Sequence, residues 1–186
     1  NGVDMRVITG TAKGKKLLAP NDERVRPTTD RIKETLFNII NPYVRDAVII
    51  DCFAGTGGIG IEALSRGARQ AYFIDNHRES IKLIRKNLEI ARLEEKGVVL
   101  PVEASSALTS LANKNVKADI IFMDPPYHLN IISRLVEIIS ENNLLAEDGI
   151  IIAEHDNRIE LKDQIERFAK VDQRVYGTTI MSYYKE

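Results

Sequence analysis

The sequence predicts an α/β protein with a Rossmann-like, doubly wound and mostly parallel sheet. From residue 47 onward, apolar strand-like runs alternate with segments of helical periodicity, which is the order of parallel strands joined by crossover helices. Three of these runs end in an acid, namely Asp51, Asp75 and Asp124. Ligands bind at the carboxyl ends of the strands in such sheets, so the acids indicate a site at that edge.

Seven strands are expected, and the last two form a C-terminal antiparallel hairpin about Gly177. The strand-like segments are 47–51, 70–75, 98–102, 118–124, 149–153, 171–176 and 178–184. The expected helices are one that starts after Thr28 or Thr29 and ends at Asn41-Pro42, one over 58–66, one from residue 78, and one over 131–139.

A small β-hairpin extension is expected at the N-terminus, from segments 5–10 and 16–19. Its charged residues from 5 to 20 are all basic: Arg6, Lys13, Lys15 and Lys16. We therefore divide the chain into a basic hairpin over residues 5–25 and an α/β domain over residues 26–186. A basic arm on a nearly neutral body suits local contact with a polyanion. A solvated charged hairpin without a binding role is the alternative.

Composition narrows the class of protein. The 186 residues suit one α/β domain, and the formal net charge of −1 argues against indiscriminate nucleic-acid binding. No apolar run approaches the roughly 18 residues of a membrane span, so we expect no membrane contact. The single cysteine, Cys52, excludes an internal disulfide and a cysteine-based zinc site. We expect a cytoplasmic monomer without a metal.

A glycine-rich segment, Asp51 to Gly60, follows the first parallel strand. Its Gly55, Gly57 and Gly60 fit the spacing of a dinucleotide-binding loop, and Asp75 lies where an acid would bind ribose hydroxyls. The same pattern suits S-adenosylmethionine. A carboxylate at Asp51 would attract the ammonium group of that cofactor and repel a pyrophosphate. A dinucleotide-dependent dehydrogenase stays as a minor alternative.

The strongest strand ends in Asp124-Pro125-Pro126-Tyr127. The Asp124 carboxylate can accept a hydrogen bond from an exocyclic amine. The prolines stiffen the turn, so that the Pro125 carbonyl can point at the same amine, and Tyr127 offers a face on which a base can stack. This segment is typical of a clamp for an unstacked base, and it suits guanine or adenine.

These motifs resemble those of class I S-adenosylmethionine-dependent methyltransferases. Two N-terminal segments, Met5 to Leu17 and Arg26 to Glu34, further resemble the opening of RsmD-type enzymes. The resemblance covers Met5 to the C-terminus. It implies methylation of the N2 amine of a guanine in small-subunit (16S) ribosomal RNA, within a small subunit or an assembly intermediate. The alternatives are an adenine-N6 nucleic-acid methyltransferase and a non-catalytic RNA-binding assembly factor.

The resemblance also implies roles for individual residues. Members of the family commonly bind the adenine amino group with an Asp or Asn that precedes an Ala on the loop after the third strand, and Ser106-Ala107 is expected in that place here. Because serine is shorter, Glu103 or a water is the expected substitute. The catalytic residues would be Asp124, Pro125 and Tyr127. The cofactor would be bound by Asp51, Gly55, Gly57, Asp75, Asn76, Ser106, Ala107 and Thr28. The RNA would be contacted by Arg6, Lys13, Lys15, Lys16 and Arg26.

Overall fold

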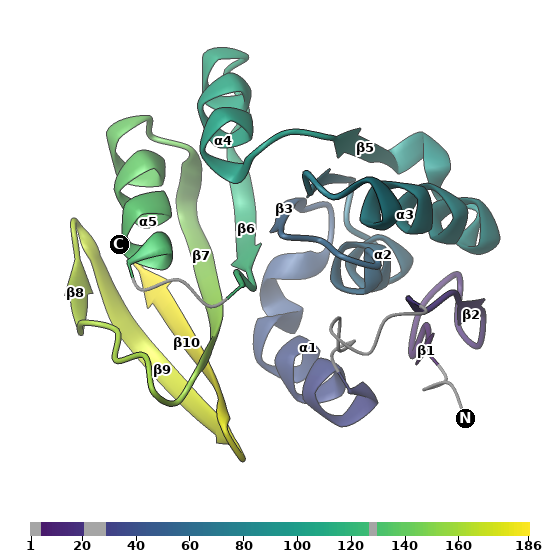
Figure 1. The fold of residues 1–186 in the computed structure, drawn as a ribbon, viewed down its shortest axis with the longest axis horizontal. Coiled ribbons are helices and arrows are strands. Elements are labelled where there is room, and N and C mark those ends of the chain that lie inside the picture. The colour runs from purple at the N-terminus through teal and green to yellow at the C-terminus, as the bar shows by residue number, and fades with distance from the viewer. Residues whose placement is uncertain (1–4, 21–28, 127–129) are drawn as a thin grey trace.

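The computed structural model describes residues 5–20, 29–126 and 130–186. Within them lie an eight-stranded mixed sheet, in the order β5-β4-β3-β6-β7-β10-β9-β8, and a separate pair, β1 and β2 (Figure 1). The predicted fold class is confirmed. The predictions for Arg26, Thr28 and Tyr127 fall outside the described residues.

Five strands form the parallel part of the sheet, and the edge strand β5 pairs only with β4. They are β3 (Val48–Cys52), β4 (Gln70–Ile74), β5 (Gly97–Leu100), β6 (Ala118–Met123) and β7 (Leu145–Asp156). All five residues of β3 are buried, because it is a central strand with helices on both faces.

The C-terminal hairpin consists of β9 (Phe168–Tyr176) and β10 (Thr179–Lys185), and β10 inserts antiparallel beside β7. The predicted hairpin is therefore confirmed. An eighth strand, β8 (Gln164–Ile165), pairs with β9 and was absent from the seven strands expected. Two residues are too short to show the alternation that identifies a strand in sequence.

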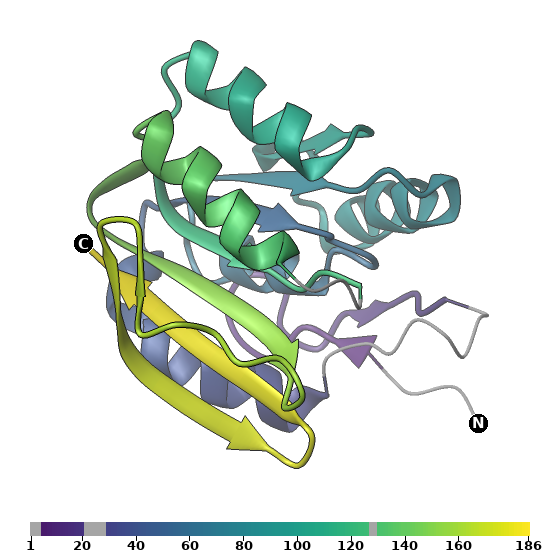
Figure 2. The ribbon, with the colours of Figure 1, turned by 60° about the vertical axis from the view of Figure 1, so that its left-hand side comes forward.

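Helices cover both faces of the sheet (Figure 2). One core contains residues of α1 (Asp30–Val44), α2 (Gly58–Ser65) and α3 (Arg78–Ala91), and the other contains residues of α4 (Ala104–Asn113) and α5 (Ile131–Glu141). A short 3₁₀ turn, η1 (Glu94–Lys96), leads into β5. Within the described ranges, no helix has the length and apolar character needed to cross a membrane.

The first helix starts as predicted and ends later than predicted. Thr29 is its N-cap, and the Thr29 hydroxyl accepts a hydrogen bond from the Ile32 amide at 3.3 Å. The end predicted at Pro42 is wrong, because α1 continues to Val44. A proline this close to the end removes one backbone hydrogen bond, and burial of Val44 in the core favours continuing the turn.

The N-terminal hairpin, β1 (Met5–Arg6) paired with β2 (Lys16–Leu17), is amphipathic. Its apolar residues lie in the same core as α1, α2 and α3; they are Met5, Val7, Ala12 and Leu17. Its basic residues are exposed; they are Arg6, Lys13, Lys15 and Lys16. The hairpin thus packs on the α/β body and directs its positive charges outward.

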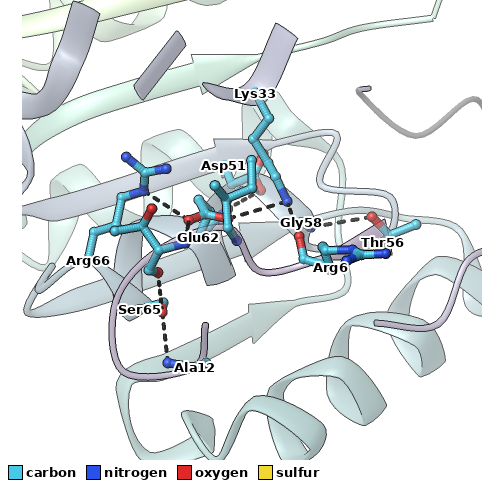
Figure 3. Close-up of polar contacts among 12 residues, drawn as sticks. Arg6, Ala12, Lys33, Asp51, Thr56, Gly58, Glu62, Ser65 and Arg66 are labelled. Carbon is cyan, nitrogen blue, oxygen red and sulfur yellow. Dashed lines mark hydrogen bonds and ion pairs between the residues drawn. The ribbon is translucent and has the colours of Figure 1, made fainter. Parts of the chain in front are cut away.

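A fully buried carboxylate, Glu62 of α2, holds the hairpin in place (Figure 3). It accepts hydrogen bonds from the backbone amides of Ile8 at 2.8 Å and Thr9 at 3.1 Å. Arg66 Nε lies 2.9 Å and Lys33 Nζ 3.3 Å from its oxygens. The two cations and two amides compensate the cost of burying this charge.

Two further side chains link the hairpin to the body. Lys33 Nζ donates to the backbone carbonyl of Arg6 at 2.8 Å. Asn87 of α3, fully buried, accepts from the Leu18 amide at 2.7 Å and donates to the Leu18 carbonyl at 3.0 Å. Its amide also donates to the Thr56 carbonyl at 2.9 Å. One side chain therefore connects the hairpin with the glycine-rich segment.

Replacement of Glu62 by Gln should destabilise the fold by about 2–4 kcal/mol. The new amide would place N–H groups against backbone donors and would leave Lys33 without its buried counter-ion. Urea unfolding of parent and variant measures the difference. Glu89→Gln, an exposed change on α3, serves as the control. Equal stability of the Glu62 variant and the parent would contradict the anchoring role.

Candidate active site at the carboxyl edge of the sheet

Four acidic residues line the carboxyl edge of four neighbouring strands, β4, β3, β6 and β7. Asp75 follows β4, Asp51 lies in β3, Asp124 follows β6 and Glu154 lies in β7. We call these four residues the acid row. The predicted Asp51, Asp75 and Asp124 do lie on adjacent strands, as the strand-end pattern indicated.

The sequence reasoning missed Glu154. In the register of β6 and β7, Met123 pairs with Ala153, so Asp124 and Glu154 come next on their strands. A signal was present, because the expected strand 149–153 is followed directly by Glu154. An acid that directly follows an apolar strand indicated the other three residues, and the same criterion applied to this strand identifies Glu154.

The glycine-rich segment turns tightly from β3 into α2. Gly57 has φ of +81°, a conformation that favours glycine, and its amide donates to the Ala54 carbonyl at 2.8 Å. The amide of Gly60 donates to Asp51 Oδ2 at 3.1 Å. A Cβ at Gly60 would lie 2.4 Å from the Phe73 ring, so the glycine allows α2 to approach β4 closely. The N-terminus of α2 and Asp51 thereby meet.

Asp75 fixes the other side of the same loop. Its Oδ2 accepts from the Gly55 amide at 2.9 Å, and its Oδ1 accepts from the His77 amide at 2.8 Å. Each carboxylate oxygen keeps a further lone pair for a ligand hydroxyl. The adjacent Asn76 is exposed. The loop geometry therefore leaves Asp75 able to bind a diol.

Burial makes three members of the acid row costly to ionise, namely Asp51, Asp124 and Glu154, and repulsion adds to the cost for Asp51 and Glu154. Asp51 is 2% exposed, and its pKa is raised well above the ordinary value, mainly by burial. The Gly60 amide lowers this pKa, whereas the charges of Asp124 and Asp75 raise it. A cationic ligand would relieve this repulsion, while a pyrophosphate would increase it. The site thus favours a positively charged cofactor over a dinucleotide.

Asp124 and Glu154 form a pair of carboxyl groups in contact. Burial raises the pKa of Asp124 to about 6, although a hydrogen bond with Glu154 lowers it. Burial, followed by the negative charge of Asp124, raises the pKa of Glu154 to about 8. Pro125 follows Asp124 and is half-buried, at the rim of the site.

The residues expected to bind the adenine lie elsewhere than the sequence suggested. Ser106 and Ala107 belong to the first turns of α4, rather than to the loop after β5. Ser106 is exposed and lines an open groove with Arg134 and Ile138 of α5, and Ala107 is buried in the core. Glu103 is the exposed N-cap residue of α4, directly after that loop.

Three further polar residues, Cys52, His155 and Ser182, are buried and pack within the fold. Cys52 is buried, and burial raises the pKa of its thiol, so it is a poor nucleophile. His155 Nε2 lies 2.9 Å from the buried Ser182 hydroxyl, and burial lowers the pKa of its ring.

Across residues 5–20, 29–126 and 130–186, no three His, Cys, Asp or Glu side chains converge as a metal site requires.

The strand order and the glycine-rich loop are those of a class I methyltransferase fold. A family model described as "Conserved hypothetical protein 95" matches residues 5–185. The chain belongs to this family.

Several relatives cover most of the chain. It is 39% identical over 182 residues to "Putative rRNA methyltransferase YlbH" of Bacillus subtilis (strain 168), covering 98% of this chain and 99% of the relative. It is 38% identical over 150 residues to "Ribosomal RNA small subunit methyltransferase D" of Escherichia coli (strain K12), covering 81% and 74%. The solved structure "Putative methyltransferase yhhF from Escherichia coli" superposes with a TM-score of 0.85, at 31% identity and 97% coverage of both chains.

Asp124 and Glu154 should make the stability of the fold decrease as pH rises. A carboxyl group whose pKa is raised by folding contributes most below its ordinary pKa, and the contribution is lost as pH rises through the folded pKa. With values of about 6 for Asp124 and about 8 for Glu154, the loss should extend from pH 4 to pH 8. The free energy of unfolding, measured in urea at several pH values, should show it.

The variant Asp124→Asn separates this effect from other titrations, such as that of His155, whose lowered pKa acts in the opposite direction. Between pH 5 and pH 8, the free energy of unfolding of the variant should decrease less than that of the parent. The difference between the two decreases should be about 2–4 kcal/mol at most. The exposed Glu141→Gln should follow the parent. If the free energy of unfolding of parent and Asp124→Asn changed equally with pH, ionisation of Asp124 would carry no cost in stability.

Proposed function

We propose that this chain is an S-adenosylmethionine-dependent methyltransferase of small-subunit ribosomal RNA, and that it methylates the N2 amine of a guanine. The observation that carries the proposal is the acid row, with the Asp124-Pro125 turn beside a glycine-rich loop. Family membership and relatives named as rRNA methyltransferases support the choice of RNA as substrate.

The residues of the site fit the proposed cofactor. Asp51, buried and repelled by its neighbours, suits the methionine ammonium group, and Asp75 suits the ribose hydroxyls. Asn76 and Glu103 follow β4 and β5 and suit the adenine, with Glu103 better placed than Ser106. Gly55 and Gly57 would pack against the cofactor, and Thr28 remains a proposed contact. When bound, the cofactor supplies a methyl group on a positively charged sulfur.

The chain's own contribution to the reaction is to bind, orient and polarise the acceptor. The Asp124 carboxylate and the Pro125 carbonyl would accept hydrogen bonds from the amine, which fixes its lone pair toward the methyl group. Their negative charge and dipole also stabilise the positive charge that develops on the nitrogen. Tyr127 would stack on the base after it leaves the RNA stack.

The choice of guanine over adenine depends on the family resemblance, since the Asp-Pro-Pro-Tyr turn suits either amine. An inactive assembly factor is less favoured, because a pure RNA binder has no need to keep Asp51 buried beside other acids. We further propose that the protein works as a cytoplasmic monomer on 16S rRNA within a small subunit or an assembly intermediate.

The test of the function is methyl transfer from labelled S-adenosylmethionine to separated 16S rRNA, small subunits, assembly intermediates and DNA. Nucleoside analysis of the product should show N2-methylguanosine from the RNA-containing substrates. Labelled N6-methyladenosine would replace this function by the adenine-directed one. Cofactor binding without any transfer to these substrates would favour the assembly factor.

Asp124→Ala should abolish transfer, by about 10³-fold or more, because the acceptor amine loses both orientation and charge stabilisation. The affinity for the cofactor, measured by calorimetry, should stay within about threefold, since the ammonium and ribose contacts are made by other acids. The control Glu141→Ala, at an exposed position, should retain both methyl transfer and cofactor affinity. Turnover of the Asp124 variant at the parent's rate would refute the assigned role.

Reversal of charge at Lys13, Lys15 and Lys16 should weaken RNA binding about 10- to 100-fold at moderate salt, without changing cofactor affinity. Each lost phosphate contact should reduce the slope of log K against log salt by about 0.7–0.9. Reversal at Lys114 and Lys162, which are exposed outside the hairpin, is the control. Unchanged RNA affinity in the hairpin variant would remove the hairpin from the RNA interface.

A further inference from the structure

We propose that Glu154 is a positioning residue of the methyl-transfer site, which shares one proton with Asp124 and holds that carboxyl group ionised and oriented toward the acceptor amine. The catalytic consequence rests on the proposed function, whereas the sharing of the proton is a property of the free protein. None of the motifs in the sequence includes this residue.

The strand register brings the two side chains together. Because β6 and β7 are parallel and Met123 pairs with Ala153, Asp124 and Glu154 are the next residues at the same edge. Glu154 also pairs with Met181 of β10, so its strand is enclosed on both sides at this point. A central strand with partners on both sides limits how far the side chain can move away.

The surroundings of the Glu154 carboxyl group favour its protonated form. Its Oε2 is buried, and no amide, hydroxyl or cation of the described residues donates to it. Its neighbour is the Asp124 carboxyl, and two carboxyl groups form a hydrogen bond only when one of them is protonated. With both ionised, Oε2 would be an unpaired buried charge beside another negative charge.

The other groups that face this pair do not supply a cation. Asp51 of β3 adds a further negative charge. From β10, Tyr183 presents a hydroxyl that is buried and unpartnered among the described residues, and its pKa is raised by burial. Arg174 of β9, whose charge acts on Tyr183, is bound to Asp172. A shared proton therefore compensates the pair.

The two groups should lose their protons in separate steps. Burial raises both pKa values, to about 6 for Asp124 and about 8 for Glu154, so one proton remains between these limits. The Glu154 carboxylic acid then donates to Asp124, whose second oxygen is available to accept from the amine. The proton that the amine loses on methylation would pass to Asp124, leaving two neutral carboxylic acids until water removes it.

A carboxyl-detected NMR titration of the free protein tests the shared proton directly. In ¹³C-labelled protein, the Asp124 and Glu154 carboxyl signals should each respond to two common steps, well above the ordinary range for these residues. Glu154→Gln should leave a single step for Asp124, whereas the control Glu147→Gln, exposed on the same strand, should keep both. Independent titration of each carboxyl near its ordinary pKa would overturn the proposal, whatever the activity.

The pH dependence of single-turnover methyl transfer tests the consequence for catalysis. Glu154→Gln keeps a donor to Asp124, so the acid limb of its profile should stay near that of the parent. The break near pH 8, which reports loss of the Glu154 proton in the parent, should disappear because glutamine does not titrate. Glu154→Leu removes the donor that lowers the pKa of Asp124. Its acid limb should therefore move up by about one pH unit, which lowers the rate at pH 6 by about fivefold and is recovered by pH 9.

These outcomes separate the two proposals. If the parent transfers methyl groups and the profiles of both Glu154 variants coincide with it, the positioning role is wrong and the function stands. If the parent transfers none while the NMR titration shows two shared steps, the shared proton stands and the function is wrong. A structural role alone would lower the rate of Glu154→Leu equally at all pH values.

Discussion

Buried like charges at the carboxyl edge of the sheet are the constraint on which the rest of this structure depends. Four acids occupy neighbouring strand ends, and the charges of their neighbours raise the cost of ionising Asp51 and Glu154. Such an arrangement is unfavourable for stability and favourable for a cationic ligand. The site therefore stores an electrostatic cost in the free protein that binding of a positively charged cofactor would lower.

The surrounding fold compensates part of this cost with backbone donors. The Gly60 amide at the start of α2 donates to Asp51, and the Gly55 amide donates to Asp75. Helix N-termini carry partial positive charge, so the turn into α2 is well suited to lie against these carboxylates. Asn87 connects the same turn to the N-terminal hairpin through Thr56 and Leu18. The segments that carry the proposed cofactor and RNA contacts are thus joined through the buried side chain of Asn87.

The regular elements were largely predictable, because they follow from the periodicity of apolar residues. The parallel strands, the C-terminal hairpin and helices α1, α2, α3 and α5 show such periodicity. The failures have local causes. Pro42 was taken as a helix end, but burial of Val44 extends α1 past it. The helix that contains Ser106 was read as a loop, and β8 is too short to leave a pattern.

By itself, the sequence determined the class of fold and three of the four acids at the site, because an acid after an apolar run is visible in one dimension. It also determined the basic character of the N-terminal hairpin. Only the tertiary structure decided that Glu154 contacts Asp124, that Glu62 and Asn87 hold the hairpin, and that Glu103 lies where Ser106 was expected. Those contacts depend on strand register and helix placement, which join residues far apart along the chain and leave no spacing in the sequence to reveal them.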